Sequence, residues 1–152
     1  MSHTTTLKGV QIKDRRCIEA AVADLKREGI NIELLRNATP RMYYREQERE
    51  IGVCDYVLKL PGSRYDVGLK WNAKDNQFDA LLDTFAGDIS RSIGAACPLP
   101  RDEYGREGEH AIGRFTQRYG VNAARFAAQA QGYYVEGETV DESGAVQLVI
   151  AL

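Results

Sequence analysis

Apolar residues recur at helical spacing in two stretches of this chain. The first stretch follows Asp14, a residue type that caps helix N-termini, and it stops at Gly29. The second stretch lies toward the C-terminus and stops at Gly132. The apolar positions are Ile18, Ala21, Val22 and Leu25 in the first, and Ile112, Phe115, Tyr119, Phe126 and Ala130 in the second. Each set falls on one face at 3.6 residues per turn, which predicts two amphipathic helices.

The second helix contains Gly120, and a glycine weakens a helix by roughly 1 kcal/mol relative to alanine. Two interpretations therefore stay open. The helix is continuous, or it breaks at Gly120 and a new helix begins with Asn122 as its cap. In a continuous helix Arg114, Arg118 and Arg125 share a second face, whereas a break ends this alignment after Arg118.

Segments that alternate between apolar and polar residues predict strands. The expected strands are Thr4–Lys13, Ile30–Leu34, Val53–Leu60, Tyr65–Trp71, Gln77–Leu82, Tyr133–Val140 and Ala145–Leu152. The last two flank the turn Asp141–Gly144 and predict a hairpin, and a short helix capped by Asp88 is expected after the fifth strand. We expect an α+β fold, as one domain over residues 1–152: a mainly antiparallel sheet of about six to seven strands with helices packed on one face.

The last strand is apolar on both faces. Leu148 and Ile150 lie on one face, and Val149 and Ala151 lie on the other. A strand of this kind is typical of the interior of a sheet or of a buried interface. We therefore expect the protein to form a homo-oligomer.

Composition places the chain among soluble globular proteins, with 43% hydrophobic and 28% charged residues. No apolar run is long enough to cross a membrane, and the N-terminus lacks an apolar signal region. The cysteines Cys17, Cys54 and Cys97 are odd in number and lack CxxC spacing, which indicates reduced thiols. We expect a cytoplasmic protein without a membrane partner.

Residue types that perform catalysis are present without the partners that such chemistry needs. His3 and His110 have no further ligands at zinc-site spacing. Asp79 and Asp83 would lie about 13 Å apart on one strand face, too far for acid–base cooperation, and we expect a solvated face there. Cys17 and Cys54 have no neighbouring histidine and are expected to be buried thiols. Phosphate-binding glycine motifs are missing from the sequence. We therefore expect a non-enzymatic protein with no catalytic residues, no metal and no cofactor.

Arginine and tyrosine are interleaved in the polar segment Arg36–Arg49, which Pro40 interrupts and which we expect to be a sheet edge, a loop or a bent strand extension. Its candidate binding residues are Arg36, Arg41, Tyr43, Tyr44 and Arg45. Single-stranded nucleic acid is bound by such segments, because rings stack on bases and guanidinium groups hold the backbone. The following glutamates partly cancel the charge, and the whole chain has a net charge of −2. The alternative interpretation is an exposed segment whose charges pair with one another.

Three stretches resemble a family of uncharacterised conserved reading frames known from plastids, cyanobacteria and bacteriophages. They are MSHTTTLKGVQIKD, the pair CDYVLKL and YDVGLKW, and FTQRYGVNAARFAAQAQGYYVEGETVDESGAVQLVIAL. The resemblance covers most of the chain and departs most clearly at Arg36–Arg49. It implies no catalytic residues, because the family has no established activity. It also implies an accessory role, since bacterial members tend to lie near a gene for an AAA-type ATPase. For a phage-encoded member, the expected location is the cytoplasm of the host.

The leading functional hypothesis is a nucleic-acid-binding accessory protein that prefers single-stranded DNA and serves a replication or transcription machine. Its binding residues would be the five named above together with Arg114, Arg118 and Arg125. The alternative is a protein-interaction adaptor, for example for an AAA-type ATPase or a polymerase, because tyrosine and arginine are also favoured at protein interfaces.

Overall fold

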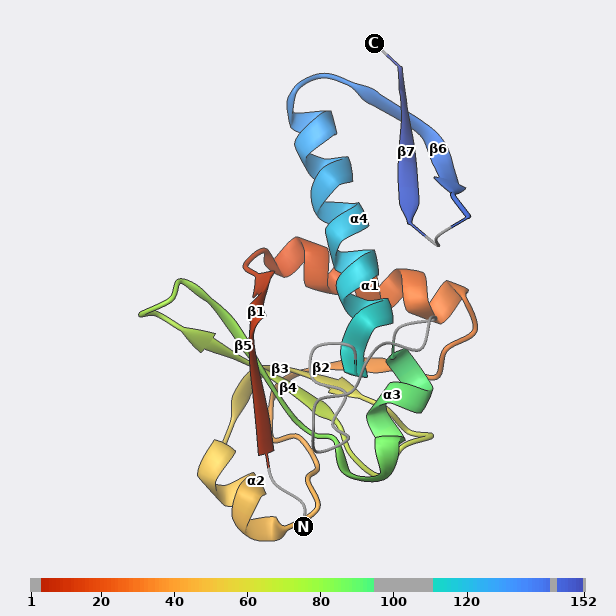
Figure 1. Cartoon of the computed structure of the whole chain (residues 1–152). Helices are drawn as coiled ribbons and strands as arrows, with labels where there is room; N and C mark the ends of the chain where they lie inside the picture. Colours follow the sequence, from red (N-terminus) through yellow and green to blue (C-terminus); the bar gives the residue numbers. More distant parts are fainter. Residues whose placement is uncertain (1–3, 95–110, 143–144, 152) are drawn as a thin grey trace.

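Five antiparallel strands form the main sheet, in the order β1-β5-β4-β3-β2 (Figure 1). They are β1 (Thr4–Ile12), β2 (Glu33–Ala38), β3 (Cys54–Lys59), β4 (Val67–Asn72) and β5 (Gln77–Asp83). The computed structural model describes residues 4–94, 111–142 and 145–151, with side chains from residue 11 onward. The candidate residues His3, Cys97 and His110 lie outside the described residues.

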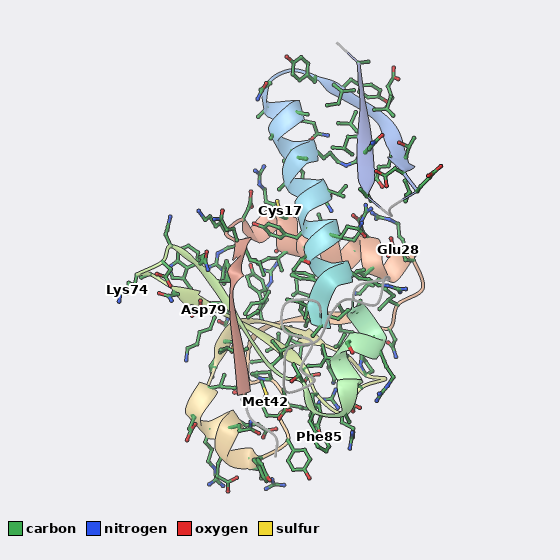
Figure 2. The ribbon with its side chains drawn as sticks, in the orientation of Figure 1. Cys17, Glu28, Met42, Lys74, Asp79 and Phe85 are labelled. Carbon is green, nitrogen blue, oxygen red and sulfur yellow. The ribbon has the colours of Figure 1, made fainter. Side chains whose placement is uncertain are left out.

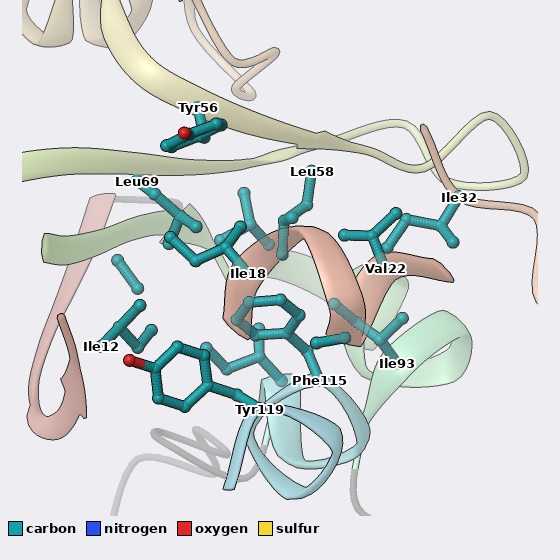
Figure 3. Packing of buried hydrophobic residues seen from close by; sticks show 14 of the residues in the cluster. Ile12, Ile18, Val22, Ile32, Tyr56, Leu58, Leu69, Ile93, Phe115 and Tyr119 are labelled. Carbon is teal, nitrogen blue, oxygen red and sulfur yellow. The ribbon is translucent and has the colours of Figure 1, made fainter. Parts of the chain in front are cut away.

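Helix α1 (Arg15–Arg27) packs its apolar stripe on this sheet. The Asp14 carboxylate accepts a hydrogen bond from the Arg16 backbone N–H at 2.8 Å, so the predicted cap is confirmed. Figure 3 shows Ile18 and Val22 of α1 beside Leu58 and Leu69 of the sheet. These side chains are at most 3% exposed, and they form the centre of the hydrophobic core.

Helix α4 (Gly113–Ala130) is continuous through Gly120, so the interpretation with a break is wrong. Phe115 and Tyr119 belong to the core that α1 shares with the sheet (Figure 3). The Tyr119 hydroxyl also accepts hydrogen bonds from the backbone N–H groups of Lys13 and Asp14, each at 2.8 Å. Burial of this face outweighs the roughly 1 kcal/mol that a glycine costs in a helix.

The last two strands, β6 (Tyr134–Val140) and β7 (Val146–Ala151), form a separate two-stranded sheet. The predicted α+β class, the antiparallel pairing and the number of about seven strands are confirmed, with five strands in one sheet and two in the other. Among the described strands, β7 pairs only with β6. The expectation that β7 lies in the interior of a sheet of its own chain is therefore wrong, and the interface interpretation stays a prediction.

A short helix that the apolar pattern did not predict, α2 (Arg45–Ile51), follows β2. Ile51 of α2 packs with Met42, Cys54 and Val57 in a second, smaller apolar cluster. Since Val57 and Leu58 are consecutive in β3, their side chains point to opposite faces of the sheet, and α2 lies on the face away from α1. Within Arg36–Arg49, the first three residues belong to the edge strand β2, residues 39–44 form an irregular connection, and the rest are helical. The expectation of an edge or a loop is therefore confirmed as far as residue 44 and wrong for Arg45–Arg49.

The connection after β5 contains the 3-10 turn η1 (Phe85–Gly87) and helix α3 (Asp88–Ile93). Gly87 caps α3, and Asp88 is its first helical residue, so the predicted capping role of Asp88 is wrong. Its carboxylate binds arginine side chains instead. Asp83 is fully buried and accepts a hydrogen bond from the Phe85 backbone N–H, which corrects the expectation of a solvated face at that residue.

Candidate functional site

The eight predicted binding residues fall into two separate regions of the molecule. Arg36, Arg41, Tyr43, Tyr44 and Arg45 lie in or between β2 and α2, whereas Arg114, Arg118 and Arg125 lie on α4. Figure 1 shows α2 at one end of the molecule and the upper half of α4, with its hairpin, at the other end. One binding groove lined by all eight side chains is therefore not formed within the chain.

Arg36 and Arg41 are each paired with a carboxylate of the same chain. Arg41 donates from Nε and Nη2 to the Asp66 carboxylate at 2.9 and 2.8 Å, and from Nη2 to the carbonyls of Leu60 and Ser63 at 3.0 Å. The Asp66 side chain is only 4% exposed, and its hydrogen bonds raise the pKa of Arg41. Arg36 pairs with Glu19. Both arginines therefore have structural contacts that the sequence did not reveal.

Arg118 and Arg125 line a charged cleft between α1, α4 and β6. Arg118 donates to Asp24 Oδ2 from Nε and Nη2 at 3.1 and 2.8 Å, and to both oxygens of Glu138 at 3.1 and 3.0 Å. Arg125 donates to the same Glu138. The cleft has a volume of about 510 Å³ and is lined by Asp24, Arg27, Glu28, Arg118, Asn122, Arg125 and Glu138.

This charged cleft contains three arginines and three carboxylates, so its formal charges balance. The Arg118 and Asp24 side chains are 12% and 9% exposed, and Asn122 donates to the same Asp24 oxygen at 2.7 Å. The Arg118 guanidinium keeps the pKa of Glu138 below its ordinary value, although burial acts in the opposite direction. The cleft thus joins the hairpin to the two helices, and each of its arginines already binds a carboxylate.

Tyr43 and Tyr44 meet Phe85 in a cluster of exposed rings, which we call the aromatic patch. The three side chains are 44%, 45% and 39% exposed. The ring centroid of Tyr43 lies 4.7 Å from that of Tyr44 and 5.0 Å from that of Phe85, in edge-to-face geometry. Figure 2 shows Phe85 at the same end of the molecule as Met42, which precedes Tyr43 in the chain. A contiguous cluster of exposed rings is a candidate interaction site.

Buried carboxylates hold Phe85 and its surroundings in place. Asp83 accepts the Phe85 backbone N–H at 2.9 Å, and Ala86 adopts a left-handed backbone with φ of 58° directly after it. Arg64 lies over the Phe85 ring at 5.8 Å and donates from Nε to Asp88 at 2.6 Å. The Arg64 hydrogen bond lowers the pKa of Asp88, so this carboxylate stays charged beneath the patch.

The segment before the two tyrosines is held by contacts with Asp66, with α2 and with β4. The Asp66 backbone N–H donates to the Arg41 carbonyl at 3.1 Å, and the Met42 backbone N–H donates to Glu48 at 3.1 Å. A Cβ on Gly68 would meet Pro40 Cγ at 2.9 Å, so glycine at this position lets the segment cross close to the sheet. The patch therefore rests on a rigid support rather than on a free loop.

Charges around the aromatic patch are mixed in sign. Arg45 and Arg49 form no ion pair with any residue that the structure describes, and both line an open depression of about 470 Å³ with Thr39, Glu48 and Gly52. Helix α2 also contains Glu46, Glu48 and Glu50. The patch is thus aromatic and nearly neutral, without a basic groove among the described residues.

Reactive groups in the described part of the chain have surroundings that suppress reactivity. Cys17 and Cys54 are buried, as expected, and burial raises the pKa of both thiols. Over residues 4–94, 111–142 and 145–151, no three His, Cys, Asp or Glu side chains come together to hold a metal ion. The described helices include none that is long and apolar enough to cross a membrane.

Sequence reasoning missed two members of this surface, Phe85 and Arg64. Phe85 lies 42 residues after Tyr43, and their contact forms because the segment after β2 crosses the sheet past Gly68 and Asp66 and so reaches the end of β5. An isolated phenylalanine beside Gly87 and Asp88, in a stretch without strand or helix periodicity, was the only sequence signal of an exposed ring.

Comparison with known proteins identifies a family without assigning an activity. The sequence profile of a family described as "Protein of unknown function (DUF1257)" matches residues 25–149. The matched range includes the aromatic patch and every residue that lines the charged cleft except Asp24. No curated protein matches this chain. No solved structure matches it either.

Proposed function

We propose that this chain, which belongs to the DUF1257 family, is a non-enzymatic adaptor that docks a protein partner on its aromatic patch. The partner would be part of a larger machine, and an AAA-type ATPase or a polymerase is the expected class. The observation that carries the proposal is the clustering of Tyr43, Tyr44 and Phe85 as exposed rings on a rigid support.

The chemistry of the patch favours a protein over a polyanion. Tyrosine and arginine dominate the energetic centres of protein interfaces, where rings fill pockets and lose little conformational entropy. Nucleic-acid binding instead depends on unpaired cations that neutralise phosphates. Among the six arginines first expected to bind, Arg36, Arg41, Arg118 and Arg125 already bind carboxylates. Only Arg45 and Arg114 have no such partner among the described residues.

Single-stranded nucleic acid is the second candidate partner. Arg45 and Arg49 follow Tyr44 in the chain and line an open depression. The exposed rings of the patch could stack on bases, at about 1–3 kcal/mol each. A fluorescence titration with single- and double-stranded oligonucleotides at low and high salt tests this candidate. Tight, salt-dependent binding that Arg45→Ala weakens would favour nucleic acid over a protein partner.

The proposal is tested by photo-cross-linking in the native host. Benzoylphenylalanine replaces Tyr44, which is exposed in the patch, or Lys74, an exposed control in the turn between β4 and β5 (Figure 2). We expect the Tyr44 site to give one discrete adduct that protease removes and nuclease leaves intact. The Lys74 site should give no such adduct.

The other outcomes are equally informative. An adduct that nuclease digests supports the second candidate. Equal adducts from Tyr44 and Lys74, or none from either, overturn the proposal that the patch is a docking surface.

A further inference from the structure

The two strands of the C-terminal hairpin differ sharply in charge. Strand β6 and the following turn contain four acidic residues, Glu136, Glu138, Asp141 and Glu142, whereas β7 contains none of either sign. Edge strands of monomers are commonly protected by charges, prolines or bulges. β6 has such protection, because its register shifts between Val135 and Gly137 and its side chains are acidic. β7 has no charged side chain and no proline.

The apolar side chains of β7 are partly exposed to solvent. Glu138 pairs with Leu148 in register and contacts Arg118 and Arg125, so this face of the hairpin is turned toward α4. Val149 alternates with Leu148 and therefore lies on the face turned away from α4. Val149 is 41% exposed and Ile150 is 48% exposed. The outer edge of β7 is paired with no strand that the structure describes.

We infer that β7 is a self-association surface, on which β7 of a second copy of this chain pairs in antiparallel orientation. An uncharged strand meets its own copy without opposing like charges, whereas a β6–β6 pair would place glutamates of both copies close together. A two-stranded hairpin is marginal alone, and sheets gain independent stability from three or more strands. The resulting sheet has the order β6-β7-β7-β6 across a two-fold axis.

This geometry is closed and self-complementary, as expected for a cyclic dimer. The axis runs perpendicular to the hairpin sheet, so α4 of both copies lies on the same face. The pairing leaves the aromatic patch outside the contact, because the patch is built from η1 and from the segment between β2 and α2. The dimer therefore does not depend on the adaptor proposal.

The test is sedimentation of the full chain at micromolar concentration, with Val149→Lys and Val140→Lys compared. Both positions are exposed valines of one hairpin, but only Val149 lies on β7. We expect the unmodified chain to show twice the 17.0 kDa mass of one chain. We expect Val149→Lys to fall to a single chain with unchanged circular dichroism, and Val140→Lys to stay dimeric. A monomeric unmodified chain, or a dimer that both variants leave intact or both disrupt, overturns the inference.

Amide hydrogen exchange of the unmodified chain is a second test, and it does not depend on whether a variant folds correctly. If β7 pairs with its copy, exchange over residues 146–151 slows as protein concentration rises, while exchange in the β4–β5 hairpin stays constant. Exchange of β7 that is independent of concentration overturns the inference, whatever the behaviour of the variants.

Discussion

Arginines lie both in the charged cleft and around the aromatic patch, but only some of those around the patch are paired with a carboxylate. In the cleft, Arg118 is 12% exposed and satisfied by Asp24 and Glu138. Around the patch, Arg41 and Arg64 also bind carboxylates, whereas Arg45 and Arg49 have no ionic partner among the described residues, and the rings remain open to solvent. Arginine in a sequence therefore does not indicate a binding surface until its carboxylate partners are known. The cleft is expected to hold the fold together, and the patch is expected to bind.

The largest expected effect is on the cleft. Arg118→Ala removes hydrogen bonds to two carboxylates and leaves the poorly exposed Asp24 with fewer partners, so it should lower the free energy of unfolding by about 3 kcal/mol. Arg114→Ala is the matched control, one turn earlier on the same helix and exposed, and it should change stability by less than about 0.5 kcal/mol. Denaturant unfolding followed by circular dichroism measures both. Equal effects would show that the cleft does not stabilise the fold.

Replacing two arginines near the patch should also change the free energy of unfolding by different amounts, and the larger change should be smaller than that of Arg118→Ala. Arg41→Ala removes the bonds to Asp66 and to two carbonyls and should cost about 2 kcal/mol of unfolding free energy. Arg45→Ala should cost less than about 0.5 kcal/mol, because Arg45 has no ionic partner in the described chain. Thermal and denaturant unfolding of both variants provide the measurement. A destabilised Arg45→Ala variant would remove the distinction between a structural and a recognition arginine.

The contribution of Glu138 to the free energy of unfolding should depend on pH, and its size should be smaller than the effect of Arg41→Ala. Since the pKa of Glu138 is lowered in the folded state, its stabilising contribution is full above the unfolded pKa of about 4.3 and is lost as pH falls through the folded pKa. Glu138→Gln should therefore lower stability by about 1 kcal/mol at neutral pH, and this difference should shrink in acid. Unfolding free energies at several pH values test it, with Glu136→Gln on the same strand as control. A difference that stays constant with pH would contradict the assigned role of Glu138.

Local patterns predicted much of the fold, because they depend on neighbours in sequence. Asp14 caps α1, and Gly29 and Gly132 follow the helices that they were expected to end. Helix α2 was not predicted, since Ile51 is its only large apolar residue and no amphipathic period exists in seven residues. Its first turn is instead supported by Gln47, whose side chain accepts the Tyr44 backbone N–H at 2.8 Å.

The candidate site was predicted only in part, because its partners are distant in sequence. Tyr43, Tyr44 and Arg45 are exposed in the structure, and their binding role stays a prediction. The pairing of Arg41 with Asp66 spans 25 residues, and that of Arg118 with Asp24 spans 94. Such pairs depend on the strand order and on the crossing of α1 with α4. The pattern of residues along the sequence reveals neither the strand order nor this crossing.

The most direct test compares the two regions in one binding experiment, with the partner that the Tyr44 cross-link identifies. Calorimetry would measure its affinity for the unmodified chain, for Tyr44→Ala and for Glu138→Gln, beside the melting temperature of each. We expect Tyr44→Ala to weaken binding about 30-fold, the effect of losing about 2 kcal/mol at the centre of an interface, with a nearly unchanged melting temperature. Glu138→Gln should lower the melting temperature and leave the affinity unchanged. The reverse assignment, with affinity lost in Glu138→Gln and kept in Tyr44→Ala, would contradict the account.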